Sequence, residues 1–311
     1  MAKKSKGKFI AIGVGIVIAI GIGIAITLGT QGSDAGSSSD NQRVVFWRHI
    51  HGLGIDPLDN NILYIATHGD FYKSVNGGPP VKVDQQRADY MAFNAPPTEG
   101  VPLYASGHPS TGGNMGLVKS TDGGQTWQSV SQVLDPPVDF HAMAVSRSNP
   151  NVIMGFDSGG RGLFKTTDAG NTWQNLDYPE YITALAIAPD NSEVVFAGTE
   201  NGIFRSSNGG SSWTQLNEYK GIGIFALAFD LEGALYASTE TFGLSKSSDQ
   251  GETWQNIERP NTLTITSIAG DSENKIIYIA GFSPDGFQEV YKGSFDGSNW
   301  ELIGTNEEQQ L

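Results

Sequence analysis

The sequence predicts an all-β fold, a single β-propeller of about six four-stranded blades preceded by one transmembrane helix. Three observations predict this architecture. One short turn motif recurs along most of the chain at the length of a propeller blade. Apolar runs of strand length recur within each repeat. The 40 glycines and a charged fraction of only 17% favour many short strands and tight turns over helices.

The recurring motif reads S/T-x-D/N-x-G-x-T/S-W and has four well-formed copies. These copies pair an Asp or Asn with a Trp further along the turn: Asp122 with Trp127, Asp168 with Trp173, Asn208 with Trp213, and Asp249 with Trp254. Degenerate copies flank them, at Asn76 without a Trp and at Asp296 with Trp300. The six Asp or Asn positions are 46, 46, 40, 41 and 47 residues apart. This spacing is that of one four-stranded blade per repeat.

The residue types of the motif suit a tight turn between two strands. An Asp or Asn side chain accepts hydrogen bonds from the amides of its own turn, and Gly supplies a positive φ. The Trp is expected to pack between neighbouring blades. These residues are therefore expected to be structural.

The motifs resemble the Asp-box, or BNR repeat, of sialidases, sortilin-type ectodomains, xyloglucan-cleaving glycosidases and photosystem-assembly propellers. The resemblance covers residues 44–305 and implies a propeller scaffold. It implies no single activity, because the repeat is structural wherever it occurs and is found in proteins of unrelated function.

Apolar runs identify the first and second strands of each blade. The innermost strands are seen in GLGID, YMAFN, AMAVS, ALAIA, FALAFD and SIAGD, and the second strands in ILYIAT, PLYAS, VIMGF, VVFAG, ALYAS and IIYIA. The turn motif lies between the third and fourth strands, on one face of the propeller. The start of the first strand and the end of the second meet on the opposite face, where we expect the functional site. Residues 44–48 either close the last blade or belong to the first, which leaves the blade count open by one.

The five histidines all come before residue 142, near strand ends on that opposite face. His51 and His141 lie just before the innermost strands of blades one and three, and Asp89 is expected at the same place in blade two. His49 and Asp139 precede the first two by two residues, on the same side of an extended strand.

A second set of polar residues ends the second strands. His68 and His108 do so in blades one and two, and later blades carry Asp157 or Ser158, Glu200 and Glu240 there. Because aligned blades direct equivalent residues toward one mouth of the channel, we expect the histidines and carboxylates to cluster at that mouth.

Imidazole and carboxylate ligands in a funnel favour a divalent transition metal, Zn²⁺ or Cu²⁺, over Ca²⁺ or Mg²⁺. Acidic neighbours would strengthen the capture of a cation. The expected ligands are His51, His68, Asp89, His108 and His141, with His49 and Asp139 as alternate ligands or orienting partners. The alternative is that each His ends a strand and bonds to a loop.

Four stretches around these residues carry a second resemblance: HIHGLGID (49–56), ATHG (66–69), ASGHP (105–109) and DFHA (139–142). They are similar to an exported propeller family commonly labelled glycosylhydrolase. This resemblance implies a shared histidine-lined face without implying what the face binds. We therefore expect a binding or metal-handling module.

A glycoside hydrolase is the first alternative, because such enzymes need two carboxylates beside a sugar-binding cleft. The candidate catalytic residues are Asp89, Asp139, Glu200 and Glu240, with Asp157 also available. A sialidase-like enzyme would also use three arginines that grip a carboxylate and a tyrosine nucleophile. Among the arginines, Arg147 and Arg205 are expected on the wrong face, whereas Arg48, Arg87, Arg161 and Arg259 are available.

A scaffold for assembly of a membrane complex is the second alternative, since the photosystem-assembly and sortilin relatives imply this role and a propeller face is broad and rigid. The partner would be a membrane protein or a glycan. A net charge of −14 argues against nucleic acid, because phosphate binding needs clustered Lys and Arg. The lack of Cys excludes disulfides and thiolate metal ligands.

The N-terminal region predicts a membrane anchor. Residues 9–29 form an uncharged run about 31 Å long as a helix, enough to cross the hydrocarbon core, and we assign a transmembrane signal anchor to 9–30. Lysines in the basic stub 1–8 place it in the cytoplasm and the propeller outside the cell membrane. A Gly/Ser/Asp linker at 31–43 and an acidic tail at 306–311 flank the propeller. A cleaved signal peptide is the competing interpretation.

Overall fold

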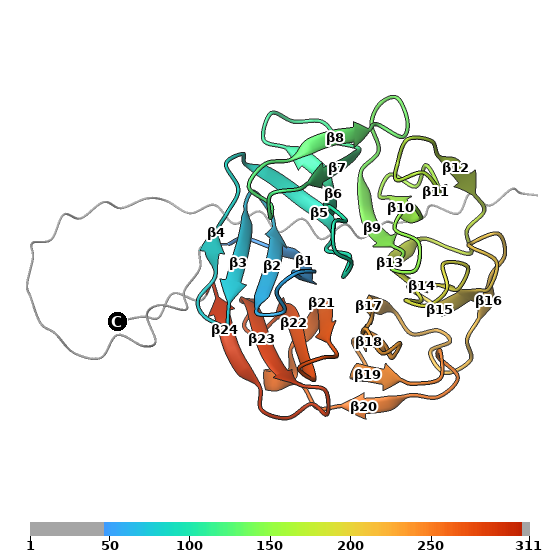
Figure 1. Cartoon of the computed structure of the whole chain (residues 1–311). Coiled ribbons are helices and arrows are strands. Elements are labelled where there is room, and N and C mark those ends of the chain that lie inside the picture. The colour runs from blue at the N-terminus through green and yellow to red at the C-terminus, as the bar shows by residue number, and fades with distance from the viewer. Residues whose placement is uncertain (1–46, 307–311) are drawn as a thin grey trace, which may run out of the picture. The chain divides into compact units, whose positions relative to one another are not determined.

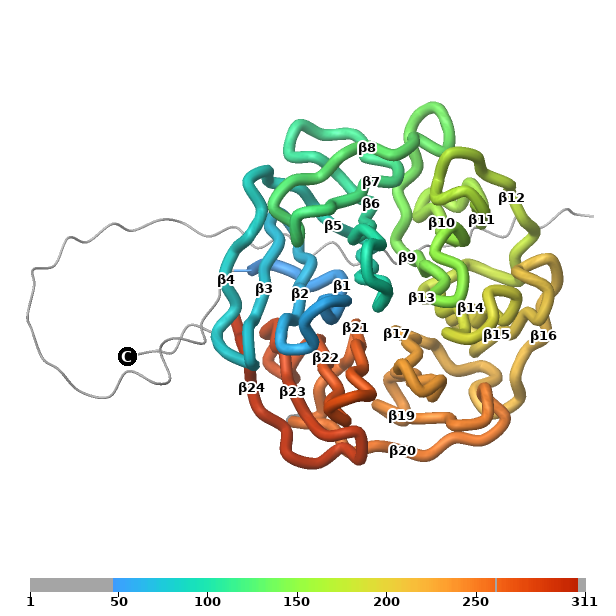
Figure 2. Tube along the Cα trace, viewed as in Figure 1, coloured from blue at the N-terminus to red at the C-terminus, as the bar shows by residue number. Residues whose placement is uncertain are grey.

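The computed structural model describes residues 47–306, which form six four-stranded antiparallel sheets around a central channel (Figure 1). Each sheet is one blade, and its strands follow one another in sequence from the channel outward (Figure 2). Blades one to three contain β1 (Ile50–Ile55), β2 (Ile62–Thr67), β3 (Phe71–Val75) and β4 (Val81–Lys82); β5 (Ala88–Asn94), β6 (Leu103–Pro109), β7 (Leu117–Ser120) and β8 (Gln128–Ser131); β9 (Phe140–Val145), β10 (Ile153–Asp157), β11 (Leu163–Thr166) and β12 (Gln174–Leu176).

Blades four to six follow the same order, and the short 3₁₀ helix η2 (Pro260–Thr262) leads into the last blade. Their strands are β13 (Ile182–Ile187), β14 (Val195–Thr199), β15 (Gly202–Ser206) and β16 (Thr214–Gln215); β17 (Ile224–Phe229), β18 (Leu235–Thr239), β19 (Gly243–Ser247) and β20 (Gln255–Ile257); β21 (Thr264–Asp271), β22 (Ile276–Phe282), β23 (Gln288–Ser294) and β24 (Glu301–Thr305). The prediction of an all-β propeller is confirmed, and the blade count is six.

Side chains close the ring, and the described residues show no exchanged strand. Blade six ends with its own outermost strand, β24, which pairs with β23. The Trp47 indole donates a hydrogen bond to the Gln288 carbonyl at 3.2 Å, and the Ile50 amide donates to the Gln288 side chain at 2.9 Å. Trp47 is buried and lies outside any strand. The first and last blades are therefore joined by these hydrogen bonds and by packing.

The hydrophobic core is divided into six clusters, each shared by two neighbouring blades. Between blades six and one, for example, Leu53 and Ile65 pack with Ala280 and Val290, and all four are buried. A blade in the ring is therefore covered on both faces. This explains why the inner strands read as near-continuous apolar runs.

The recurring turns connect the third and fourth strands and satisfy their own polar groups. In blade two, the Thr126 amide and hydroxyl donate to the Asp122 carboxylate at 2.9 and 2.6 Å. The Gly124 amide donates to the Ser120 hydroxyl at 2.9 Å. Equivalent bonds recur around Asp168, Asn208 and Asp249, whereas Asp296 keeps only bonds from Ser298.

The Gly and Trp of these turns contact the preceding blade. A Cβ at Gly124, which has a φ of 85°, would lie 2.2 Å from the Phe71 ring, so both conformation and space require glycine. Trp127 packs on Phe71 with ring centroids 5.4 Å apart, and the Trp173 indole donates to the Ser131 hydroxyl at 2.9 Å. The indoles of Trp213 and Trp300 donate to carbonyls that follow the preceding blade's last strand, whereas that of Trp254 donates to Gly251 in its own turn. The turns therefore stabilise the ring.

Within residues 47–306 no helix combines the length and the apolarity needed to cross a membrane. The predicted basic stub, membrane anchor and linker at 1–8, 9–30 and 31–43 lie outside the described residues, as do residues 307–311 of the acidic tail. The structure therefore bears on the propeller alone.

Candidate functional site

Every innermost strand carries a β-bulge at the same position. One residue per blade has no partner on the second strand there: His51, Met91, His141, Thr183, Phe225 and Thr266. A bulge re-aims the side chain of the extra residue, and all six residues line a central cavity of about 420 Å³. Blades one and three therefore present a histidine to this cavity, and blade two presents a methionine.

The strand register corrects one sequence-based prediction. Asp89 is not equivalent to the bulge histidines, because Met91 occupies that position in blade two. Asp89 is instead equivalent to Asp139 and to His49, which lie two residues before their own bulges. The sequence alignment was wrong here because a shift of two residues keeps every side chain on its original side of a strand.

The ends of the second strands align as the sequence indicates, with one adjustment. His68 and His108 each directly follow the second-strand residue, Thr67 or Gly107, that pairs with the residue just before the bulge. In the next three blades this position is held by Ser158, Glu200 and Glu240, so Asp157 is one residue earlier.

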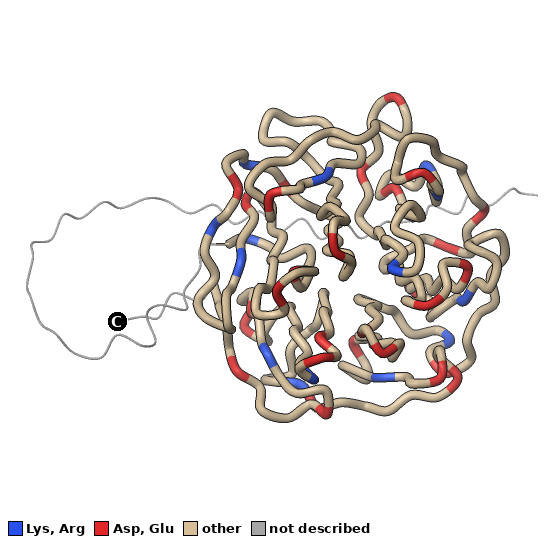
Figure 3. The backbone as a smooth tube through the Cα atoms, viewed as in Figure 1, with Lys and Arg blue, Asp and Glu red and all other residues tan. Residues whose placement is uncertain are grey.

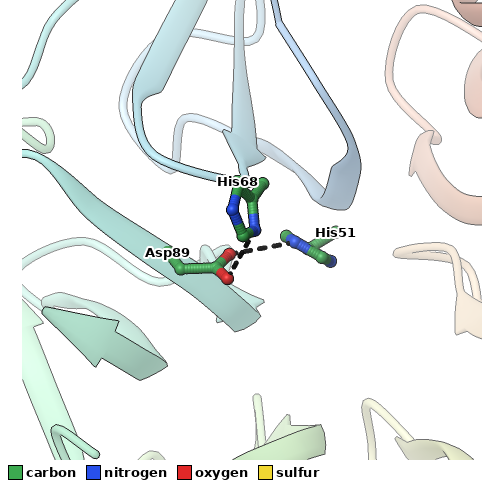
Figure 4. Close-up of side chains that lie close together, drawn as sticks. All are labelled: His51, His68 and Asp89. Carbon is green, nitrogen blue, oxygen red and sulfur yellow. Dashed lines mark ion pairs between the residues drawn. The ribbon is translucent and has the colours of Figure 1, made fainter. Parts of the chain in front are cut away.

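Two histidines and one carboxylate meet at the boundary between blades one and two (Figure 4). His51 Nε2 lies 3.0 Å from Asp89 Oδ1, and His68 Nδ1 lies 2.7 Å from Asp89 Oδ2. The side chains of His51 and Asp89 are 7% and 12% exposed, whereas that of His68 is 49% exposed. We call these three residues the first triad; it is buried on its channel side and open on the His68 side.

A second group of the same composition lies one blade further round the ring. His141 Nε2 and His108 Nε2 lie 2.9 and 3.3 Å from the same atom, Asp139 Oδ2. We call these three residues the second triad. In each triad the donor atoms lie within 4.8 Å of one another. The four histidines that were expected to share one site are therefore distributed over two.

Polar atoms in both triads are buried with few partners. Among the described residues, His51 Nε2 and Asp89 Oδ1 contact each other at 3.0 Å and have no further polar partner, and Asp139 Oδ1 has no hydrogen-bond partner. An unsatisfied buried polar group costs about 1–3 kcal/mol, and more if it is charged. A cation held between nitrogen and oxygen would satisfy both atoms at once.

His108 has its tautomer set by a loop carbonyl. Its Nδ1 lies 3.1 Å from the Gly113 carbonyl oxygen, which can only accept a hydrogen bond. In the neutral ring Nδ1 therefore carries the proton, and the lone pair on Nε2 faces the carboxylate of Asp139. One ring nitrogen is thus bonded to a backbone carbonyl and the other faces the triad, which is the arrangement of metal-bound histidines.

Asp139 is positioned by Ser158 and Asp157, which the sequence places at the end of a second strand, and through Asp157 by Arg161. The Ser158 hydroxyl donates to Asp139 Oδ2 at 2.6 Å, and the Asp139 amide donates to Asp157 Oδ1 at 2.9 Å. Arg161 donates to Asp157 Oδ1 at 2.7 Å and also bonds the Pro137 carbonyl. Asp157 and Arg161 therefore support the second triad structurally.

Gly107 allows the close approach of strands beside the first triad. It has a φ of 135°, and a Cβ at this position would lie 2.0 Å from the Asp89 carbonyl oxygen. Gly107 also directly precedes His108. No other residue fits here without moving Asp89, so this glycine helps to set the positions of residues in both triads.

Local charges keep both carboxylates ionised. Burial raises the pKa of Asp89, but the neighbouring His51 and His68 outweigh it and leave the pKa below its ordinary value. Burial likewise raises the pKa of Asp139, and the His141 contact with the Ser158 hydrogen bond more than reverses this shift. Both triads therefore present a carboxylate anion beside imidazoles.

His49 belongs to neither triad. Its ring packs at 4.6 Å from the His51 ring and 5.2 Å from the Phe282 ring, measured between centroids. Burial, with a smaller contribution from His51, lowers the pKa of His49 to about 4. His49 is therefore neutral and supports the His51 ring by packing.

The remaining candidates lie outside the triads. Glu200 and Glu240 are exposed, line neither of the two cavities described here, and make no side-chain hydrogen bond with a described residue. Most of the arginines are held by protein atoms: Arg147, Arg161 and Arg259 bond backbone carbonyls, and Arg205 bonds Gln250. Arg48 and Arg87 line a second cavity of about 410 Å³ together with His68, Asp89 and His108.

Comparisons with known proteins give structural neighbours only. No protein-family model matches the chain. No curated protein matches it either. The solved GH74 enzyme of Niastella koreensis is similar with a TM-score of 0.62 and 18% identity, over 84% of this chain and 46% of that one. The chain therefore spans less than half the length of that enzyme.

Two other neighbours match over most of both chains. A catalytically inactive virginiamycin B lyase from Staphylococcus aureus, solved with quinupristin, has a TM-score of 0.55 and 14% identity over 85% of this chain and 86% of that one. YCF48 bound to D1 peptide has a TM-score of 0.52 and 15% identity over 84% and 83%. The likeness is one of fold. Proteins with such different names share the β-propeller, so the likeness assigns no function to this chain.

Proposed function

We propose that this propeller binds a divalent transition metal through its two triads, with His51, His68 and Asp89 as the principal ligands. The observation that carries the proposal is the grouping of two histidines and one carboxylate within 4.8 Å in each triad, with His51 Nε2 and Asp89 Oδ1 buried and 3.0 Å apart. Two donors of one tetrahedral Zn²⁺ ion, each about 2.0–2.1 Å from the metal, lie about 3.3 Å apart. The contacts within the triads, between 2.7 and 3.3 Å, are at or somewhat below this value, so a bound ion would move the donors slightly apart.

The donor set favours Zn²⁺ or Cu²⁺. Two imidazoles and one carboxylate suit these ions better than Ca²⁺ or Mg²⁺, which prefer oxygen ligands. Three protein ligands also leave a tetrahedral ion one open position, as in catalytic zinc sites. The second triad offers the same donors from His108, Asp139 and His141. We therefore propose a metal-handling face in which the bound ion can exchange its fourth ligand.

Calorimetric titration of the full-length chain with Zn²⁺ and Cu²⁺ tests this proposal, with Mg²⁺ as the control ion. Asp89→Asn should weaken one of the two sites about 10-fold or more, because the first triad then lacks its carboxylate, and should leave the second site unchanged. Glu240→Gln removes an exposed carboxylate outside the triads and should leave the affinity of both sites unchanged. Protein that binds neither ion, or an Asp89→Asn variant that keeps both sites at full affinity, would refute the first site.

A glycoside hydrolase is the second candidate function. The specific support is the likeness to the GH74 enzyme together with two ionised carboxylates, Asp89 and Asp139, in neighbouring blades. A panel of glycosides that includes xyloglucan tests it. Activity that is lost in Asp89→Asn or Asp139→Asn and kept in Glu200→Ala and Glu240→Ala would favour this function, and a panel without any hydrolysis would exclude it.

The place of the propeller also belongs to the proposal. Residues 9–30 would hold it at the outer face of the cell membrane, where its rigid face could contact a membrane protein or a glycan. The sequence of the anchor supports this placement. Separation of cell membranes from soluble fractions tests it: the chain should stay with the membranes after a salt wash, and recovery in the soluble fraction would contradict the anchor.

A further inference from the structure

The second cavity lies beside both triads. Its volume is about 410 Å³, and one histidine from each triad, His68 and His108, lines it. Arg48, Arg87, Asp89 and Ser110 also line it. The other histidines, His51 and His141, line the central cavity instead. An ion held by the first triad would therefore be reached from the second cavity past the half-exposed ring of His68.

Two arginines give this cavity a charge opposite to that of the chain. The chain has 33 acidic and 19 basic residues, and Figure 3 shows Lys and Arg sparse among Asp and Glu over the propeller. Arg48 is exposed and makes no hydrogen bond or ion pair with a described residue. Its guanidinium is therefore available to a ligand.

Arg87 lies close to the first triad. A Cβ placed at Gly69, the residue after His68, would lie 3.3 Å from Arg87 Nη2. The Arg87 side chain is 66% exposed, and its Nε lies 3.5 Å from Asp70 Oδ1, so it keeps donors free for the cavity. Guanidinium groups bind carboxylates and phosphates through paired hydrogen bonds. The cavity thus combines two oxyanion-binding side chains with the exposed edge of the triad.

We propose that the second cavity binds a small oxyanion, a carboxylate or phosphate group, which takes the open coordination position of a metal held by His51, His68 and Asp89 while Arg48 and Arg87 neutralise its charge. This inference rests on the proposed metal site. Binding requires the metal, because the anion is one of its ligands and Asp89 also lines the cavity. The cavity volume of about 410 Å³ also leaves room for a larger body attached to the anionic group.

The full-length chain loaded with one equivalent of Co²⁺ provides the test. Co²⁺ replaces Zn²⁺ in such sites and reports a change of its fourth ligand by a change in visible absorption. Inorganic phosphate and acetate are titrated separately, which distinguishes a phosphate ligand from a carboxylate ligand. We expect saturable binding of at least one anion, weakened at least fivefold in Arg48→Gln and Arg87→Gln. Lys220→Gln, an exposed cation in the loop between blades four and five, is the matched control and should bind like the parent chain.

The outcomes separate this inference from the proposed function. Unchanged Co²⁺ affinity with weakened anion binding in the two arginine variants supports both. Normal Co²⁺ binding with no spectral response to either anion overturns the inference and leaves the metal site in place. Equal anion affinity with and without Co²⁺ also overturns it, since the anion would then not be a metal ligand. Failure to bind Co²⁺ or Zn²⁺ overturns the proposed function itself.

Discussion

The Nδ1 atom of His68 lies 2.7 Å from Oδ2 of Asp89, across the boundary between blades one and two. The backbones of these two residues also form an antiparallel bridge. The same relation recurs one blade further on, where His108 Nε2 lies 3.3 Å from Asp139 Oδ2. Because each carboxylate contacts the histidine of the preceding blade, a cation in either triad would join two blades. The proposed metal binding would therefore be coupled to the stability of the ring.

This coupling predicts that metal stabilises the protein against unfolding. A ligand that binds only the folded state adds about 2.7 kcal/mol at a free concentration of 100 times its Kd. Zn²⁺ should therefore raise the midpoint of urea unfolding, and Mg²⁺ should not. The shift should be smaller in Asp89→Asn, which retains only the second triad. An identical unfolding midpoint with and without Zn²⁺ would contradict the coupling.

Gly107→Ala should damage both the fold and the site. The new Cβ would lie 2.0 Å from the Asp89 carbonyl oxygen, and the positive φ is unfavourable for alanine. We expect a loss of about 1–3 kcal/mol in the free energy of unfolding and weaker Zn²⁺ binding. Gly100→Ala is the control, because Gly100 also has a positive φ but nothing lies within 4 Å of its Cβ position. Equal Zn²⁺ affinity in both variants would exclude a positioning role for Gly107.

Arg161→Ala should affect the second triad and spare the first. Asp157 is 1% exposed and loses its charge partner in this variant, which costs about 3 kcal/mol of folding free energy. Asp139, whose amide donates to Asp157, should shift with it. Calorimetry should then show one Zn²⁺ site of parental affinity and one weakened site. Weakening of both sites to the same extent would indicate a global effect.

The recurring turns predict how stability depends on acid. Hydrogen bonds from Thr172 and Thr253 lower the pKa of Asp168 and Asp249, respectively, to about 2. A carboxylate whose folded pKa lies below its unfolded value of about 3.9 stabilises the fold above pH 4, and the contribution is lost between about pH 4 and pH 2. Urea unfolding should therefore show that the free energy of unfolding falls less between pH 4 and pH 2 in the double variant Asp168→Asn, Asp249→Asn than in the parent chain. A parallel loss in both proteins would show that these turns do not titrate as described.

The fold was predictable because the turn motif marks every blade. Asp122 and its equivalents recur at blade spacing, and their hydrogen bonds are local, so the sequence alone identifies them. The mode of ring closure was not predictable, since the contact between Trp47 and Gln288 joins residues 241 positions apart. Such contacts depend on the curvature of the whole ring.

The candidate site was predictable in its residues and only partly in its grouping. Strand ends identified the face on which His68 and His108 lie. The equivalence of Asp89 with Asp139 was missed, because the bulge that fixes the register leaves no mark in a pattern of period two. The support from Arg161 was also missed, since one arginine in a loop carries no sequence signal. The φ of 135° at Gly107 likewise becomes meaningful only beside the Asp89 carbonyl.

X-ray absorption at the zinc edge of the full-length chain loaded with Zn²⁺ is the most direct measurement of the central claim. We predict nitrogen and oxygen ligands at about 2.0–2.1 Å with the outer-shell scattering of two imidazoles per ion. In His51→Ala that imidazole signal should fall. Zinc surrounded only by oxygen ligands, with a spectrum unchanged in His51→Ala, would contradict a metal centre built from these triads.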